Sequence, residues 1–292
     1  MTYLFTHNDL DGVGCAVIAR LAFPSDLSIK YCSYKSVNDD INAYLETAQS
    51  DDRILITDIS VNEATASRLD GYNVRMFDHH PIEVIRPWMT IDNSGKECGT
   101  TLLAQALLAP MSPAVWMFTQ NILLFDTWEF MKFKGDLPER MNALHDLLGH
   151  EGFVEMAVEQ LSQNQGFAIP HYFEIAIAHS FEERDRYFQR KEEALITTTL
   201  KGFTAGVVFA DRDVSLMAEY VFERHPELDI VAVCYMPAGV SLRTRRDDIN
   251  LTEICRERGG GGHQKASAYY LKRDVAGRAV DVILEEGGFE HG

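Results

Sequence analysis

The sequence predicts an α/β fold with two domains: an N-terminal domain built on a parallel sheet and a smaller C-terminal α/β domain, joined by a helical connector. Short apolar segments alternate with helical segments over residues 1–80 and again from residue 203, which is typical of βαβ units. Between them, residues 169–199 are charged, with apolar side chains near helical spacing. We therefore expect domains at residues 1–170 and 201–292 and the connector at residues 171–200.

The first part of the N-terminal domain alternates strictly between strand and helix. Its helices carry apolar side chains on one face, as Ile41 and Leu45 show. Either Ser60 or Asn62 could cap the third helix. The predicted strands are residues 2–5, 28–32, 53–57 and 73–77, and the predicted helices are residues 12–22, 37–48 and 62–69.

The pattern becomes helical after Gly99 and alternates again in the C-terminal domain. The helices expected before the connector are residues 100–108, 113–124, 137–148 and 153–161. The connector itself is expected to be one helix or a helix pair. In the C-terminal domain we expect strands at residues 204–210, 229–236, 240–244 and 268–271 and helices at residues 214–224, 251–257 and 276–286.

Composition limits the class of protein. With 292 residues, of which 46% are hydrophobic, the chain is long enough to bury a substantial core. Its five cysteines are scattered without a CxxC pair, which is typical of reduced thiols. The start of the chain lacks the pattern of a signal peptide, and no apolar run is long enough to span a bilayer. We therefore expect a cytoplasmic protein without a membrane partner.

The charge argues against a protein that grips long nucleic acids. The net charge is −17, whereas a broad electrostatic grip on a polyanion requires a basic surface. Residues 243–265 are the exception, because this segment contains six basic and only four acidic side chains. If the protein binds an anion, this balance favours a short one held at a local site.

Ionisable side chains cluster where three of the predicted strands end. His7, Asp9 and Asp11 follow the first strand, Asp58 follows the third, and the triplet Asp78-His79-His80 follows the fourth. The carboxyl ends of parallel strands lie at one edge of a sheet, so we expect these groups to converge. Taken singly, each has a simpler interpretation: a capped turn, a helix cap at Asp58, or exposed histidines.

Together with Asp126, which lies inside an apolar stretch, these residues make a set of metal-ligand type. Carboxylates and imidazoles without a thiolate suit Mn²⁺ and related ions more than a structural zinc ion. So many carboxylates repel one another unless about two divalent ions compensate them, and such ion pairs are typical of phosphoryl hydrolysis.

A run of four glycines at residues 259–262 is the second strong signal. Glycines let backbone N–H groups approach a phosphate closely. His263 and Lys265 follow the run, and Arg243, Arg245 and Arg246 precede it. A flexible linker is the alternative, but linkers are unusual between a helix and a strand of one patterned domain. We therefore expect an anion site here.

These motifs, in this order, resemble the DHH phosphoesterase superfamily with its DHH-associated C-terminal domain. The resemblance covers nearly the whole chain. It implies two Mn²⁺ ions, held on one side by His7, Asp9 and Asp58 and on the other by Asp11, Asp58, His79 and Asp126. It also implies that Asp78 orients His79 and that His80 faces the scissile phosphate. The residues implied to hold a terminal nucleotide are Arg243, Gly260, Gly261, Gly262 and His263.

The resemblance implies metal-assisted hydrolysis of a phosphodiester in a cleft between the domains. With the acidic charge, it favours short single-stranded oligonucleotides or linear dinucleotides such as pGpG over long duplex DNA. The alternatives are cyclic dinucleotides, 3′-phosphoadenosine phosphate, a single-strand-specific exonuclease activity, or a nucleotide-binding regulator without activity. A homodimer is compatible with all of these.

Overall fold

The computed structural model describes residues 1–82, 84–132, 136–235, 239–272, 275 and 278. The chain divides into two compact units, Met1–Ala178 and His179–Gly292. The predicted α/β class is confirmed, because the first unit contains a parallel sheet and the second a mixed sheet, each covered by helices. The finer division at residues 170 and 200 stays a prediction.

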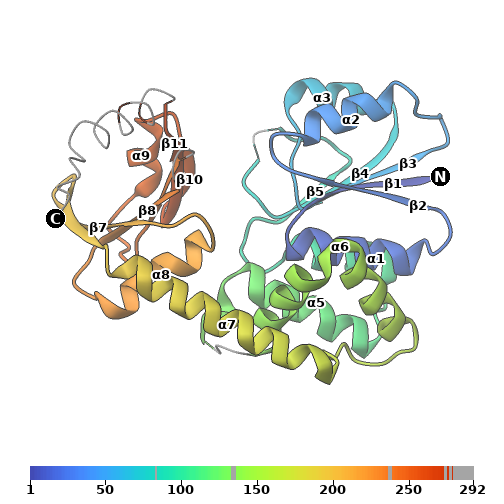
Figure 1. Ribbon diagram of the computed structural model, residues 1–292. Helices are drawn as coiled ribbons and strands as arrows, with labels where there is room; N and C mark the ends of the chain where they lie inside the picture. The colour runs from blue at the N-terminus through green and yellow to red at the C-terminus, as the bar shows by residue number, and fades with distance from the viewer. Residues whose placement is uncertain (83, 133–135, 236–238, 273–274, 276–277, 279–292) are drawn as a thin grey trace. The chain divides into compact units, whose positions relative to one another are not determined.

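The first unit is built on a five-stranded sheet in the order β2-β1-β3-β4-β5, with every neighbouring pair parallel (Figure 1). The four predicted strands are present, and a short fifth strand that the sequence did not indicate pairs with β4. The strands are β1 (Thr2–His7), β2 (Leu27–Cys32), β3 (Arg53–Thr57), β4 (Asn73–Asp78) and β5 (Met89–Ile91).

Helices cover both faces of this sheet (Figure 1). On one face α2 and α3 bury Ile41, Leu45 and Leu69 against Ile54 and Ile56. The other face carries α1, which packs against α4, α5 and α6. The helices are α1 (Leu10–Ala22), α2 (Val37–Leu45), α3 (Glu63–Leu69), α4 (Gly99–Leu108), α5 (Pro113–Asp126), the 3₁₀ turn η1 (Glu129–Lys132) and α6 (Leu137–Ser162).

Helix α6 covers both segments that the sequence predicts as separate helices. The two segments meet at Gly149, whose φ of 67° kinks the helix. Glycine reaches this left-handed conformation without steric penalty, so the chain turns there and continues as helix. The element labelled α6 therefore consists of two helical segments on either side of Gly149, which agrees with the two predicted helices.

The second unit contains a six-stranded sheet in the order β10-β11-β9-β8-β7-β6, in which only β7 and β8 pair in parallel. Its core has two layers. Helix α8 and the end of α7 bury Val221 and Phe188 on one face, and α9 buries Leu251 and Cys255 on the other. The elements are α7 (His171–Glu192), which spans both units, β6 (Ile196–Leu200), β7 (Phe203–Phe209), α8 (Val214–Arg224), β8 (Ile230–Tyr235), β9 (Gly239–Arg243), α9 (Leu251–Arg256), β10 (Gly261–His263) and β11 (Ala266–Tyr270).

The helical prediction for residues 169–199 is wrong beyond Glu192. Residues Ile196–Leu200 form the edge strand β6, antiparallel to β7. This segment contains Ile196 and three threonines, and β-branched side chains favour the strand conformation. The helix predicted at residues 276–286 lies outside the described residues, apart from Arg278.

No helix within the described residues combines the length and the apolarity needed to cross a membrane.

Candidate metal centre

The ionisable side chains of the first unit meet at the carboxyl edge of its sheet. His7 ends β1, Asp58 follows β3, and Asp78 ends β4. In the sheet, β2 lies on one side of β1 and β3 on the other. The order of the strands therefore reverses between β1 and β3, which makes this place a topological switch point. Open parallel sheets bind ligands at the carboxyl ends of their strands at such a point.

One group of possible ligands consists of His7, Asp9 and Asp58. Nδ1 of His7 lies 2.7 Å from Oδ2 of Asp9 and 3.7 Å from Oδ2 of Asp58. Asp9 also caps α1, because its other oxygen accepts the N–H of Gly12 at 3.1 Å. Asp9 can therefore both cap α1 and bind a metal ion, because one of its oxygens accepts the helix N–H and the other faces His7.

A second group consists of Asp11, His79 and Asp126. Nε2 of His79 lies 3.9 Å from Oδ2 of Asp11 and 3.4 Å from Oδ2 of Asp126. It also lies 3.3 Å from Oδ1 of Asp58. Helix α5 supplies Asp126 at its last residue, from the layer of helices rather than from the sheet.

Asp58 belongs to the first group and to a third possible group, with Asp78, His79 and His80, and it has an unusual environment. Asp58 is 0% exposed, and neither of its carboxylate oxygens has a hydrogen-bond partner. Its φ is 55°, a left-handed conformation that is uncommon outside glycine and that concentrates at functional sites. It does not cap α3, since Asn62 does so by accepting the N–H of Thr65 at 2.9 Å. A buried, unpaired carboxylate in a strained backbone requires a compensating cation or a proton.

The N-terminus of α4 fixes the carboxylate of Asp11. The N–H groups of Gly99 and Thr100 donate to its two oxygens at 2.6 and 2.8 Å. A Cβ on Gly99 would lie 2.7 Å from Cβ of Asp58 and 2.9 Å from Oδ2 of Asp11, so glycine is needed for this close approach. The dipole of α4 stabilises this carboxylate. Its two N–H donors bind the side chain of Asp11, so they are not available to a bound phosphate.

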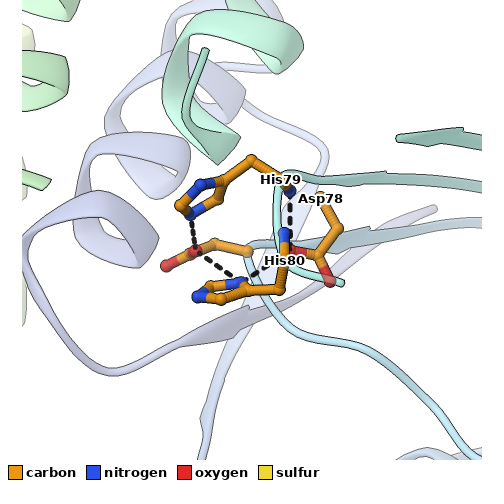
Figure 2. A group of neighbouring side chains, drawn as sticks. Asp78, His79 and His80 are labelled. Atoms are coloured by element: carbon orange, nitrogen blue, oxygen red, sulfur yellow. Dashed lines mark hydrogen bonds and ion pairs between the residues drawn. The ribbon is translucent and has the colours of Figure 1, made fainter. Parts of the chain in front are cut away.

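The triplet after β4 divides into residues with different partners (Figure 2). Oδ1 of Asp78 accepts the backbone N–H groups of His79 and His80 at 2.8 and 3.2 Å, and Nδ1 of His80 donates to it at 2.8 Å. The carboxylate of Asp78 thus holds the ring of His80 and the backbone of His79, and the expectation that it orients the ring of His79 stays a prediction. Both rings lie near Oδ1 of Asp58, at 3.3 Å for Nε2 of His79 and 3.8 Å for Nδ1 of His80.

Electrostatics agree with a site for cations. Burial and the charges of Asp11 and Asp9 raise the pKa of Asp58 well above its usual range, and the same causes raise the pKa of Asp126 to about 8. Burial lowers the pKa of His79, which favours the neutral imidazole that a metal binds. The carboxylate and imidazole donors, with two unpartnered oxygens among them, fit divalent metal ions.

We expect the metal-free protein to lose stability as the pH rises from about 4 to 8. The folded pKa values of Asp58 and Asp126 lie above the value of about 4 for an unfolded aspartate, so the folded state binds more protons in this window and stability falls as they leave. The pKa of His79 is lowered and that of His80 is raised, so their effects partly offset one another. Thermal unfolding in a chelator should give a Tm that is lower at pH 8 than at pH 5 by roughly 5 °C.

The control for this prediction is Asp126→Asn, which removes one raised carboxyl and should make the pH dependence shallower. A Tm of the wild type that is constant or rises between pH 5 and 8 would contradict the assignment of uncompensated carboxylates.

The second unit brings its predicted binding residues to neighbouring strands. Arg243 on β9 and His263 on β10 both stand opposite Ala266 of β11, on its two sides. His263 is exposed and Arg243 is partly buried. The glycine run and Arg243, separated in sequence, thus lie at one end of the second sheet.

The three arginines of this region differ in their partners. Arg245 donates to Glu219 at 2.6 Å, and Arg246 pairs with Asp229 and Asp248. Arg243 makes no ion pair among the described residues and donates to the hydroxyl of Ser215 at 2.7 Å. Burial lowers the pKa of Arg243, and the nearby charge of Glu219 offsets this effect only in part. The three arginines therefore differ in their acidic partners, a difference that the sequence did not show, and which of them contacts a phosphate stays a prediction.

The glycines of the run also differ. A Cβ on Gly260 would lie 2.1 Å from the carbonyl oxygen of Ala268, and one on Gly262 would lie 2.6 Å from that of Ala266. Gly261 has no atom within 4 Å of that position. Gly260 and Gly262 are therefore needed for close packing against β11, whereas Gly259 and Gly261 have open space around the Cβ position, so their backbone could face a ligand.

Sequence reasoning missed Tyr34, which follows β2. Its ring centroid lies 5.0 Å from that of His7 and 6.1 Å from that of His80. The available signal was its place after a strand of the same parallel sheet, at the edge where the other site residues gather.

Comparison with known proteins identifies relatives. The chain is 32% identical over 295 residues to the oligoribonuclease NrnB of Bacillus subtilis (strain 168), which covers 94% of this chain and 74% of that protein. No protein-family model matches the chain.

Among solved structures, the chain resembles the pGpG-specific phosphodiesterase PggH of Vibrio cholerae, with a TM-score of 0.60 and 14% identity over 98% of both chains. It also resembles RecJ of Thermus thermophilus in complex with Mn²⁺, with a TM-score of 0.63 and 14% identity over 99% of this chain and 52% of that one. At these identities the two structures show a shared fold.

Proposed function

The chain belongs to the DHH phosphoesterase superfamily, and from this premise we propose that it is a manganese-dependent phosphodiesterase that hydrolyses short oligonucleotides to mononucleotides. The observation that carries the proposal is the metal centre: carboxylates and imidazoles form overlapping groups that could hold metal ions, and the oxygens of Asp58 have no hydrogen-bond partner. The relative named an oligoribonuclease supports the substrate class.

We assign the ligands of two divalent ions from the two groups. His7, Asp9 and Asp58 would hold one ion, and Asp11, Asp58, His79 and Asp126 the other, with Asp58 between them. Such ions supply a nucleophile at neutral pH, by lowering the pKa of a bound water, and charge neutralisation for the phosphate. We propose Mn²⁺ because mixed carboxylate and imidazole donors suit it.

The chain's own contribution to proton transfer is the pair Asp78 and His80. Asp78 is fully buried and accepts the Nδ1 proton of His80, which fixes the ring so that Nε2 points away from the turn. The side chain of His80 is 31% exposed, so substrate can reach Nε2. The hydrogen bond to Asp78 and the nearby carboxylates outweigh burial and raise the pKa of His80. A protonated His80 would therefore stabilise charge on the phosphate or donate its Nε2 proton to the leaving oxygen.

The second unit would hold the terminal nucleotide. Arg243 offers a guanidinium without a carboxylate partner, Gly261 an open backbone, and His263 an exposed ring on the neighbouring strand. The adjacent Arg245 and Arg246 are neutralised by acidic side chains, so the basic surface is too small to track a long polyanion.

The test of the proposal is a substrate panel with Mn²⁺: 5′-phosphorylated oligonucleotides of two, three, five and 20 nucleotides, as RNA and as DNA. We expect the dinucleotide to trinucleotide range to give the highest kcat/KM. Faster cleavage of the 20-mer than of the dinucleotide would refute a short-substrate enzyme and favour a single-strand exonuclease.

A second candidate is hydrolysis of cyclic dinucleotides or of 3′-phosphoadenosine phosphate. The neighbour whose name specifies pGpG supports the linear dinucleotide instead. Product analysis with cyclic-di-GMP, pGpG and 3′-phosphoadenosine phosphate separates these activities, since only the linear substrate should be consumed at a substantial rate.

We expect Arg243→Ala to raise KM for a phosphorylated dinucleotide about 30-fold with little change in kcat. The reason is the loss of a charge-assisted hydrogen bond to the terminal phosphate, which is worth about 1.5–3 kcal/mol. Steady-state kinetics at saturating Mn²⁺ measure it. Arg245→Ala is the matched control, since its ion pair with Glu219 is exposed, and its KM should stay within about threefold of wild type. Equal losses in both variants would show that the region acts only through general charge.

A further inference from the structure

We infer that Tyr34 is a substrate-contacting residue of the metal centre, where its ring stacks on the nucleobase next to the scissile phosphate. This inference rests on the proposed function and assigns a specificity residue within that site. It starts from the position of Tyr34, in the turn between β2 and α2 at the carboxyl edge of the sheet.

Tyr34 stands beside both ends of the centre. Its ring lies 5.0 Å from the ring of His7, which ends β1, and 6.1 Å edge-on from the ring of His80, which follows β4. Its hydroxyl lies 3.4 Å from Nε2 of His80, the atom assigned to meet the substrate. A phosphate placed at the metal ligands and within reach of His80 therefore brings its nucleoside next to Tyr34.

The ring is also available. Tyr34 is 53% exposed although it contacts two buried or half-buried imidazoles, so one part of the ring is supported by the protein and the rest faces solvent. The other exposed aromatic side chains in the described part of the first unit are Trp116, Trp128 and Tyr172, and none of them makes a ring contact with a residue of the centre.

The stacking function follows from chemistry. An aromatic ring gives a base-independent platform that is worth about 1–3 kcal/mol per stacked base, whereas phosphate contacts alone do not distinguish a nucleotide from other phosphate esters. The surrounding carboxylates provide no apolar contact for a base. A supported, exposed ring beside the reacting phosphate would thus select nucleotides.

The experiment pairs changes in the enzyme with changes in the substrate. Tyr34→Leu removes the aromatic ring and keeps an apolar side chain of similar length, and Tyr34→Phe removes only the hydroxyl. The substrates are a 5′-phosphorylated dinucleotide and the same molecule with one base replaced by hydrogen, at each position in turn. Tyr172→Leu, on an exposed position of α7, is the matched control.

With the intact dinucleotide, we expect Tyr34→Leu to raise KM about tenfold, whereas Tyr34→Phe, which keeps the ring, should keep the KM of wild type. Tyr172→Leu should keep both KM and kcat. With one of the two abasic substrates, wild type and Tyr34→Leu should have the same KM, because the partner of the ring is gone. Equal losses in Tyr34→Phe and Tyr34→Leu, an unchanged KM in Tyr34→Leu, or a tenfold loss that persists on both abasic substrates would overturn the inference.

A binding measurement keeps this test separate from the proposed function. Dissociation constants are measured with Mn²⁺ for a dinucleotide that contains a non-hydrolysable methylphosphonate linkage and for its abasic forms. If wild type does not hydrolyse dinucleotides, the proposed function fails. The inference still stands if Tyr34→Leu weakens binding of the intact analogue about tenfold, and it falls if wild type and variant bind alike or if neither binds.

Discussion

Replacing Asp58 by Asn is expected to abolish turnover, with kcat/KM reduced by at least about 10³-fold, and at the same time to stabilise the protein in the presence of a chelator. The loss of activity follows from the proposed assignment, in which Asp58 would be a ligand of both ions; its carboxylate lies 3.7 Å from Nδ1 of His7 and 3.3 Å from Nε2 of His79. The gain in stability follows because the metal-free protein buries the carboxylate without a hydrogen bond.

Asn is the suitable substitute at this position. The φ of Asp58 is 55°, and Asn adopts the left-handed region more readily than other residues with a Cβ, so the backbone is not the cause of any effect. The measurements are kcat/KM with Mn²⁺, the metal content after dialysis, and the Tm in EDTA. We expect the metal content to fall and the Tm in EDTA to rise by about 5 °C.

Asp52→Asn is the matched control because Asp52 lies at the other end of β3. It is also buried, at 5% exposed, but its carboxylate accepts from Tyr44 and from the N–H of Gln49 and pairs with the terminal amine. This variant should lower the Tm and keep turnover. If Asp58→Asn behaves like Asp52→Asn, losing stability in EDTA and keeping activity with Mn²⁺, then Asp58 is a structural residue and the metal assignment is wrong.

Replacing His80 by Gln is expected to lower kcat about 10²–10³-fold, with KM and metal content close to wild type. His80 also belongs to a group that could hold a metal ion, but its Nδ1 is bound by Asp78 at 2.8 Å and lies 3.8 Å from Oδ1 of Asp58, so we assign it to proton transfer. Loss of a positioned proton donor costs roughly that factor. The distinguishing measurement is the pH profile of kcat, which should lose its alkaline limb in the variant.

Two further variants support the assignment of His80. Asp78→Asn should lower kcat in the same way, because the ring loses the acceptor that fixes its tautomer. His179→Gln, at an exposed position of α7, should change nothing. Loss of bound metal in His80→Gln would show that His80 is a metal ligand and that the different roles assigned to His79 and His80 are wrong.

The sequence determined the first half of the fold because its signals there are local. Apolar strands and amphipathic helices follow one another with clear ends, and a parallel sheet then places every strand end at one edge. The connector shows where local signals fail. Residues Ile196–Leu200 follow a charged helix without a breaker, and only pairing with β7 selects a strand.

At the site, the sequence determined which residue types gather, and the tertiary structure decided what each of them contacts. Asp78, His79 and His80 are adjacent in sequence, but their partners come from other elements, so no spacing rule could assign the acceptor of His80 or the neighbours of His79. Likewise Arg243, Arg245 and Arg246 look alike until their acidic partners are known.

By itself, then, the sequence determined an α/β protein in which carboxylates and imidazoles gather at strand ends, because residue chemistry and the order of strands along the chain can be read locally; the anion site at the glycine run stays a prediction. Only the tertiary structure showed that Asp58 is buried without a hydrogen-bond partner, that α4 holds Asp11, and that Tyr34 lies beside the centre. These features depend on burial and on contacts between segments far apart in the chain, and both arise only when the chain has folded.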